Sequence, residues 1–191
     1  MELYDLIITR RSVRQFKDIS IPIESLNRIV NAARLAPTAA NLQPLEFFVV
    51  DKAEIRENIF PCLKWAGYIE PEGNPRKGNE PTAYIFILVN SKIRDEGYEY
   101  DSGAALENMC LTAWEAGIGS CCLISIDKDK VRQILEIPDD YIIDSVVALG
   151  YPAEESKVEP WKRSVEYWKD KEGLFHVPKR KLEDITHFNK F

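Results

Sequence analysis

Apolar residues recur at helical spacing near the start of the chain, where polar residues separate them. The positions that carry this pattern are Leu26, Ile29, Val30 and Ala33. An apolar stripe with a period of about 3.6 residues predicts an amphipathic helix over residues 24–36, and Pro37 should end it. Residues 2–9 predict a shorter helix that runs into a basic sequence.

Short apolar runs predict the strands of a sheet. They occupy residues 46–50, 84–89, 119–126 and 145–149. The run at 84–89 shows no polar alternation, so both faces of that strand should be buried. A turn is expected at 150–152, and helices are expected at 52–60 and after Asp127, which can cap a helix that stops before Pro138. Strands that alternate with helices predict a central sheet flanked by helices, and the absence of G-x-G-x-x-G disfavours a Rossmann unit.

Residues 101–117 form a different kind of predicted helix, because apolar side chains cover nearly its whole circumference. These side chains are Ala104, Ala105, Leu106, Met109, Cys110, Leu111, Ala113, Trp114 and Ala116. A helix that is apolar all round has to be buried. In a chain of this length, one way to bury it is against a second subunit. Glu107 and Asn108 then need polar partners, either across the dimer or near a bound cofactor.

Composition narrows the class of protein. The 191 residues suit one sizeable domain, and 45% hydrophobic with 29% charged residues indicates a globular chain. A net charge of −6 argues against general nucleic-acid binding, which needs a basic surface. No apolar run approaches the ~18–20 residues of a membrane helix, and the first residues do not resemble a secretory leader. We therefore expect no membrane partner and a cytoplasmic location.

The four cysteines, Cys62, Cys110, Cys121 and Cys122, form no C-x-x-C pair, and only two histidines are present. Cys121 and Cys122 should point to opposite faces of one strand, so they are poor co-ligands for a single metal ion. We expect buried free thiols and no metal site.

Two polar clusters are candidates for ligand binding. RRSVR at 10–14 concentrates guanidinium and hydroxyl donors that match phosphate oxygens, or is simply the solvated basic end of the first helix. PTAANLQP at 37–44 offers amides and a hydroxyl for the edge of a heterocycle, although the same residues are common in turns. Together with PKRK at 178–181, the clusters indicate a phosphate-bearing heterocycle.

Five sequence blocks resemble the FMN-dependent nitroreductase family, in the family's order and over nearly the whole chain. They are RRSVRQF (10–16), APTAANLQP (36–44), ENM-x-L-x-A-x-x-x-G-I-G-S-C (107–121), ALGYPAEE (148–155) and PKRKLEDITHFNKF (178–191). The resemblance implies an α+β fold with a central mixed sheet flanked by helices. It also implies a homodimer formed through the long helix, with two FMN sites at the interface. Residues 1–155 would form the FMN-binding core, and residues 156–191 a C-terminal arm of the same domain.

The resemblance also implies which residues bind FMN. The first block would hold the phosphate and the pyrimidine side of the ring, through Arg10, Arg11, Ser12 and Arg14. The proline-bounded loop of the other subunit would cover the flavin, through Pro37, Thr38, Ala39, Asn41 and Gln43. Arg180 and Lys181 would join Arg10 at the phosphate. The backbone N–H of Ile124 or Ser125 would face flavin N5, although many members have glycine where this chain has Ile124.

Two longer segments concern the substrate side. The loop 61–81 is a candidate lid that carries Lys64, Trp65 and Tyr68, or else a surface excursion. Residues 156–177 are an insertion of about twenty residues without a clear period, which is longer than a usual short connection. Its aromatic residues either pack the arm on the partner subunit, which we favour, or line the pocket. They are Trp161, Tyr167, Trp168 and Phe175.

The implied function is an oxidoreductase that passes hydride from NADH or NADPH through flavin N5 to a small electron-poor acceptor, such as a nitroaromatic or a quinone. The flavin would do the chemistry, so no acid, base or nucleophile is required from a side chain. Arg14 would stabilise the negative charge of the reduced flavin. Two alternatives stay open: a specialised flavin reaction such as reductive dehalogenation, and a flavin-binding redox sensor without fast turnover.

Overall fold

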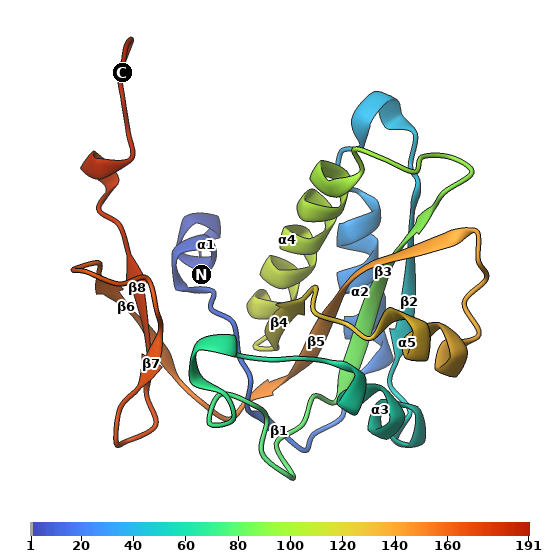
Figure 1. Ribbon diagram of the computed structural model, residues 1–191, viewed down its shortest axis with the longest axis horizontal. Helices are drawn as coiled ribbons and strands as arrows, with labels where there is room; N and C mark the ends of the chain where they lie inside the picture. The colour runs from blue at the N-terminus through green and yellow to red at the C-terminus, as the bar shows by residue number, and fades with distance from the viewer. Residues whose placement is uncertain (1) are drawn as a thin grey trace.

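The computed structural model of the protein describes residues 2–191 and combines helices with β-strands (Figure 1). Its main helices are α1 (Leu3–Thr9), α2 (Ile23–Arg34), α3 (Ala53–Ile59), α4 (Glu99–Glu115) and α5 (Lys128–Leu135). The central strands are β1 (Phe16–Lys17), β2 (Leu45–Val50), β3 (Ala83–Asn90), β4 (Gly119–Leu123) and β5 (Tyr141–Pro152). The α+β class predicted from the sequence is confirmed.

The central sheet has the strand order β1-β5-β3-β2, and β4 also pairs with β5. A mixed sheet was expected, but in the part of the chain that the structure describes all ladders of this sheet are antiparallel. Parallel pairing here is limited to the isolated bridge between Ser12 and Ser120. That expectation is therefore wrong for the ladders, because the order of the strands places every paired neighbour in the opposite direction.

Strand β3 lies at the centre of the core. Tyr84, Phe86 and Leu88 belong to a cluster that includes residues of α3 and α5, whereas Ile85 and Ile87 pack with residues of α2 and α4. Successive side chains of a strand point to opposite faces, so this strand contributes to both layers. The prediction that both of its faces are buried is confirmed.

Helix α4 buries one face within the chain, and that face is formed by Asp101, Ser102, Ala105, Met109, Cys110 and Ala113. Leu106, Leu111 and Trp114 on its remaining surface are only half-buried. One chain therefore does not bury the helix on all sides.

Three local expectations are wrong. The predicted turn at 150–152 is the end of β5, because Gly150 pairs with Gly119 of β4 and Pro152 pairs with Phe16 of β1. The strand predicted over 119–126 ends at Leu123, since the next residues leave the sheet. Strand β1 was not expected at all, because two residues are too short to form a recognisable pattern.

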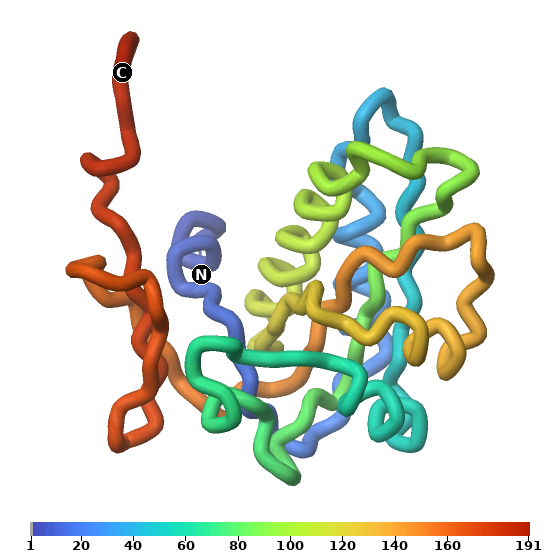
Figure 2. Tube along the Cα trace, in the orientation of Figure 1, coloured from blue at the N-terminus to red at the C-terminus, as the bar shows by residue number. Residues whose placement is uncertain are grey.

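The C-terminal arm, whose sequence shows no clear period, forms a small sheet of its own. It contains β6 (Ser156–Pro160), β7 (Trp168–Lys169) and β8 (Phe175–Lys179), with β8 parallel to β6 and antiparallel to β7. These strands have partners far along the chain, so no local period reveals them. The small sheet stands beside α1 and apart from the body that holds α2 and α4, as Figure 2 also shows.

Candidate functional site

Residues 10–14 leave α1 as an extended segment fixed to the edge of the central sheet. The N–H of Val13 donates to the carbonyl of Ser120 at 2.9 Å, and the Val13 side chain is buried. With Val13 fixed in this way, the side chains of Ser12 and Arg14 on either side of it line a pocket of about 220 Å³. The pocket is lined by Arg10, Arg11, Ser12, Arg14, Tyr167, Phe175, Val177 and Lys179. We call this space the basic pocket.

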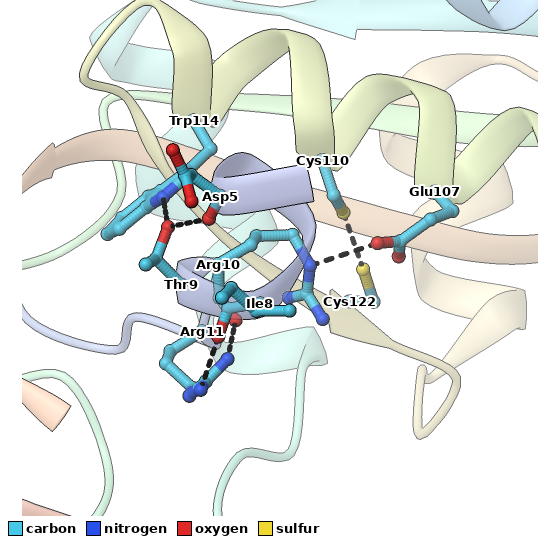
Figure 3. Close-up of polar contacts among 9 residues, drawn as sticks. All are labelled: Asp5, Ile8, Thr9, Arg10, Arg11, Glu107, Cys110, Trp114 and Cys122. Carbon is cyan, nitrogen blue, oxygen red and sulfur yellow. Dashed lines mark hydrogen bonds and ion pairs between the residues drawn. The ribbon is translucent and has the colours of Figure 1, made fainter. Parts of the chain in front are cut away.

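Arg10 reaches from this segment to helix α4, where its Nε donates to Glu107 Oε1 at 3.1 Å (Figure 3). Arg11 folds back and donates to the carbonyl of Ile8 at 2.7 Å. Burial, with a contribution from the charge of Arg10, lowers the pKa of Arg11. The positive charges of Arg10 and Arg11 therefore repel each other, and an anion bound between them would relieve this repulsion.

Arg14 is held by aromatic rings of the arm. The carbon of its guanidinium lies 5.2 Å from the ring centroids of both Tyr167 and Phe175, within the range of cation–π contacts. The Nε atoms of Arg11 and Arg14 are buried without a hydrogen-bond partner. Buried donors are normally satisfied, so an acceptor belongs in this pocket.

The basic segment at 178–181 contributes a different residue to the basic pocket from those that the resemblance implied. Lys179 lines the basic pocket, whereas Arg180 and Lys181 do not. Arg180 donates to the carbonyl of Asp184 at 2.9 Å, Lys181 is paired with Glu183 at 3.4 Å, and both basic residues are exposed. In one chain, these two residues are therefore occupied elsewhere.

Val177 and Lys179, which were not singled out from the sequence, follow a period-two signal that begins at Phe175. Phe175, Val177 and Lys179 alternate along β8, and all three line the basic pocket. Side chains at alternate positions of a strand share one face. Recognition of this strand would have singled out Lys179 rather than its two neighbours.

The proline-bounded loop has an unusual backbone. Ala40, Asn41 and Gln43 have φ values of 52°, 56° and 54°, the left-handed region that non-glycine residues rarely adopt. Buried Asp101 of α4 holds the loop by accepting from the N–H of Ala39 at 3.0 Å, and Thr38 Oγ1 accepts from the N–H of Gln43 at 3.2 Å. Strain maintained in this way is common at ligand-binding sites.

All five candidate residues of this loop lie outside the basic pocket. Pro37, Ala39, Asn41 and Gln43 are exposed, and Thr38 is half-buried. The loop lies near the N-terminal end of α4, on the side of α2, whereas α1 lies on the other side of α4 (Figure 1). One chain thus does not bring the loop and the basic pocket together.

The segment after β4 and the loop 61–81 lie next to each other. Ile124 is 76% exposed, and the carbonyl of Ser125 accepts from the N–H of Lys64 at 3.0 Å. The Lys64 side chain is exposed, whereas Trp65 packs on the core and lies 5.8 Å from the ring of Phe60. Trp65 therefore has a packing role in this chain.

Tyr68 connects the loop 61–81 with the arm. Its ring lies 5.0 Å from that of Tyr167, which in turn lies 5.4 Å from Phe175. Tyr68 is also 58% exposed. A row of aromatic rings thus runs from the candidate lid to Arg14 in the basic pocket, and aromatic residues of the insertion pack within their own chain.

Residues 2–191 lack the features of two other kinds of site. No helix there has the length and apolar character needed to cross a membrane. Over the same residues, no group of three or more histidine, cysteine, aspartate or glutamate side chains is arranged to hold a metal ion.

Known proteins that resemble this chain in sequence or in structure are named as nitroreductases or as NAD(P)H-dependent oxidoreductases. Residues 7–151 match the sequence model of the Nitroreductase family. A protein of Archaeoglobus fulgidus named as an inferred NADH dehydrogenase/NAD(P)H nitroreductase is 34% identical over 161 residues, which cover 81% of this chain and 87% of the relative. An NADPH-dependent oxidoreductase of Staphylococcus haemolyticus is 26% identical over 182 residues, with 84% and 69% covered. The solved structure of an FMN-dependent nitroreductase from Clostridium difficile R20291 superposes with a TM-score of 0.72 at 26% identity, covering 98% of this chain and 99% of that one.

Proposed function

Because the chain belongs to the nitroreductase family, we propose that it is an FMN-dependent oxidoreductase that uses NADH or NADPH to reduce a small electron-poor acceptor. The observation that carries the proposal is the basic pocket. Three arginines, one lysine and the Ser12 hydroxyl converge there, and two buried guanidinium nitrogens lack an acceptor. A phosphate group would supply that acceptor.

The residues present fit FMN in their chemistry. Arg10, Arg11, Arg14 and Lys179 would hold the phosphate, with Ser12 as a further donor. Exposed Ile124 and Ser125 follow β4 and would offer backbone N–H groups to the ring near N5. The chemistry that bound FMN supplies is hydride transfer at N5, from NADH or NADPH to an acceptor such as a nitroaromatic or a quinone.

The protein's own residues would bind and orient rather than react. Arg14 keeps a positive charge at the site, because its guanidinium does not deprotonate in proteins. Tyr167 and Phe175 fix the direction of this guanidinium through their ring faces. Tyr68, whose ring lies 5.0 Å from that of Tyr167, would contribute to the substrate side of the site.

The assembly that we propose is a homodimer. The basic pocket has a volume of only about 220 Å³, below the roughly 300–1,000 Å³ of a usual ligand pocket, and the strained loop 37–43 that could extend it lies on the other side of α4. A second copy packed on the half-buried surface of α4 would bring its own loop to this pocket. Leu106 and Leu111 on that surface would be covered at the same time.

The test begins with the purified protein. We expect it to be yellow, to release FMN on denaturation, and to lose its flavin absorbance when NADH or NADPH is added without oxygen. Addition of a nitroaromatic or a quinone should then restore the absorbance. Colourless protein that does not retain added FMN would contradict the proposal, whereas bound flavin that no nicotinamide reduces would support the redox-sensor alternative.

A further inference from the structure

Two cysteine side chains face each other between helix α4 and strand β4. The sulfur atoms of Cys110 and Cys122 are 3.3 Å apart (Figure 3). The S–S bond of a disulfide is about 2.05 Å long, so the sulfurs are unbonded and would need to approach by roughly 1 Å.

The surroundings single out this pair among the four cysteines. Cys110 is fully buried in the cluster between α4 and the sheet, and Cys122 packs against the same cluster while remaining half-buried. Cys121 points to the opposite face of β4, where it belongs to the other cluster together with Cys62. The partly accessible side of Cys122 is the route by which a small molecule would reach the two sulfurs.

The contacts of Cys110 favour its reactive form. The hydrogen bond between the two thiols lowers the pKa of Cys110, and the Ser120 hydroxyl and the charge of Arg10 act in the same direction, whereas burial and the charge of Glu107 oppose them. The same pairing raises the pKa of Cys122. The lowered pKa favours formation of the Cys110 thiolate, and the thiolate is the nucleophile in cysteine oxidation.

We propose that Cys110 and Cys122 form a redox-active dithiol, which hydrogen peroxide converts into an intramolecular disulfide. The Cys110 thiolate attacks one peroxide oxygen, the O–O bond breaks, and the departing hydroxide takes a proton to become water. The Cys122 sulfur then attacks the Cys110 sulfenic acid and expels a second water molecule. In sum, two thiols lose two electrons and two protons to one peroxide, giving one disulfide and two water molecules.

The position of this modification site is distinct from the basic pocket but adjacent to it. Cys110 lies one turn after Glu107 on α4, and Glu107 holds Arg10 (Figure 3). The disulfide would tie α4 covalently to β4 at this level of the fold. Its formation requires the two sulfurs and an oxidant, and does not depend on the identity of the substrate.

The experiment maps the thiols of the full-length protein after reduction and removal of the reductant. One sample is exposed to hydrogen peroxide and one is not; both are then denatured, alkylated and digested for mass spectrometry. We expect the peroxide sample to lose two alkylatable thiols and to contain a crosslinked peptide pair that joins Cys110 to Cys122. Treatment with a reductant after oxidation should restore alkylation at all four cysteines.

Matched variants decide the assignment. Cys122→Ser and Cys110→Ala should each abolish the crosslink, whereas Cys62→Ser should form it as the wild type does. Far-ultraviolet circular dichroism of each variant establishes that it is folded before oxidation. Full alkylation after peroxide, oxidation to sulfinic acid without a crosslink, or a disulfide that uses Cys62 or Cys121 would overturn the proposal.

Discussion

At the scale of single residues, what each cation already contacts determines its use in the basic pocket. Arg10 has one carboxylate partner, Glu107, which leaves the rest of its guanidinium fork available. The Arg14 guanidinium is oriented by rings, and within residues 2–191 the nearby Glu154 carboxylate accepts from the Arg14 backbone N–H at 2.5 Å. We therefore expect different roles for the two arginines: Arg10 would anchor FMN, and Arg14 would tune the reduction potential of the flavin.

Substitution of Arg10→Ala should weaken retention of FMN. Loss of a charge-assisted contact costs about 1.5–3 kcal/mol, which is roughly a 10- to 150-fold increase in Kd. Fluorescence titration of the flavin-free protein with FMN measures this change. Arg28→Ala is the matched control, because Arg28 pairs with Glu115 away from the pocket. Equal affinities of the Arg10 variant and the wild type would refute the anchoring role.

Substitution of Arg14→Ala should lower the reduction potential of the bound flavin, since a cation near the ring stabilises the negative charge of the reduced form. Arg14→Lys, which keeps the charge, should shift the potential less. An anaerobic redox titration of the three proteins measures the effect. A potential that is the same in all three would show that Arg14 does not act on the ring.

At the scale of elements, the small sheet of the arm is held by a buried histidine. When protonated, His176 of β8 donates to Glu159 of β6 at 2.9 Å and to Asp170, just after β7, at 3.0 Å. Its ring also stacks on Trp168 at a centroid distance of 4.8 Å. Lys157, 3.1 Å from Glu159, is the nearby cation that partly opposes the charge. One imidazolium therefore links the three strands of the small sheet. This sheet positions Phe175, at the start of β8, and Tyr167, just before β7, next to Arg14.

This linkage predicts a pH dependence of stability. The hydrogen bond with Asp170 is the main cause of the raised pKa of His176, with Glu159 adding to it. A raised folded pKa means that the contribution is complete below the unfolded value of about 6.5 and is lost as the pH rises through the folded value. The difference in melting temperature between wild type and His176→Gln should therefore shrink as the pH increases from about 6 to about 9.

The other histidine provides the control for this measurement. His187 lies in the exposed tail, and His187→Gln should melt like the wild type at each pH. A difference between wild type and His176→Gln that stays constant over the pH range would show that protonation of the ring does not stabilise the arm.

At the scale of the whole molecule, exposed apolar side chains mark the surfaces that need a partner. Tyr4 of α1 is 70% exposed, and Phe188 of the C-terminal tail is 82% exposed. Further large apolar residues are exposed in the same two segments, namely Leu3, Ile7, Ile8, Leu182, Ile185 and Phe191. Such clustering is typical of an interface. It agrees with the proposal that a second copy completes the flavin site.

Light scattering after size exclusion should therefore give the mass of two chains. Phe188→Asp should increase the fraction of single chains and reduce bound flavin, because a carboxylate would be buried without a partner at the interface. Phe188→Leu keeps an apolar side chain and should remain dimeric. If the wild type elutes as a single chain with a full complement of flavin, the proposed assembly is wrong.

The local pattern of apolar and polar residues was sufficient to predict an element wherever that pattern alone decides which faces are buried. The uninterrupted apolar run at 84–89 predicted a strand buried on both faces, and the polar interruptions of 24–36 predicted the one-sided helix α2. A central sheet flanked by helices followed from such segments, because burial of apolar surface depends on periodicity that is visible in the sequence, whereas the α+β class was implied by the family resemblance. The cationic character of residues 10–14 was visible in the same way.

The tertiary structure alone decided which distant residues meet. Strands β6, β7 and β8 depend on pairing across the arm, and that pairing places Lys179 at the basic pocket while Arg180 and Lys181 remain outside. Contacts of Arg14 with Tyr167 and of Cys110 with Cys122 likewise join segments that no local period connects. The sequence by itself thus determined the layers and the charge of this protein, because those depend on local periodicity and composition. Its site geometry depends on long-range pairing, which only the folded chain provides.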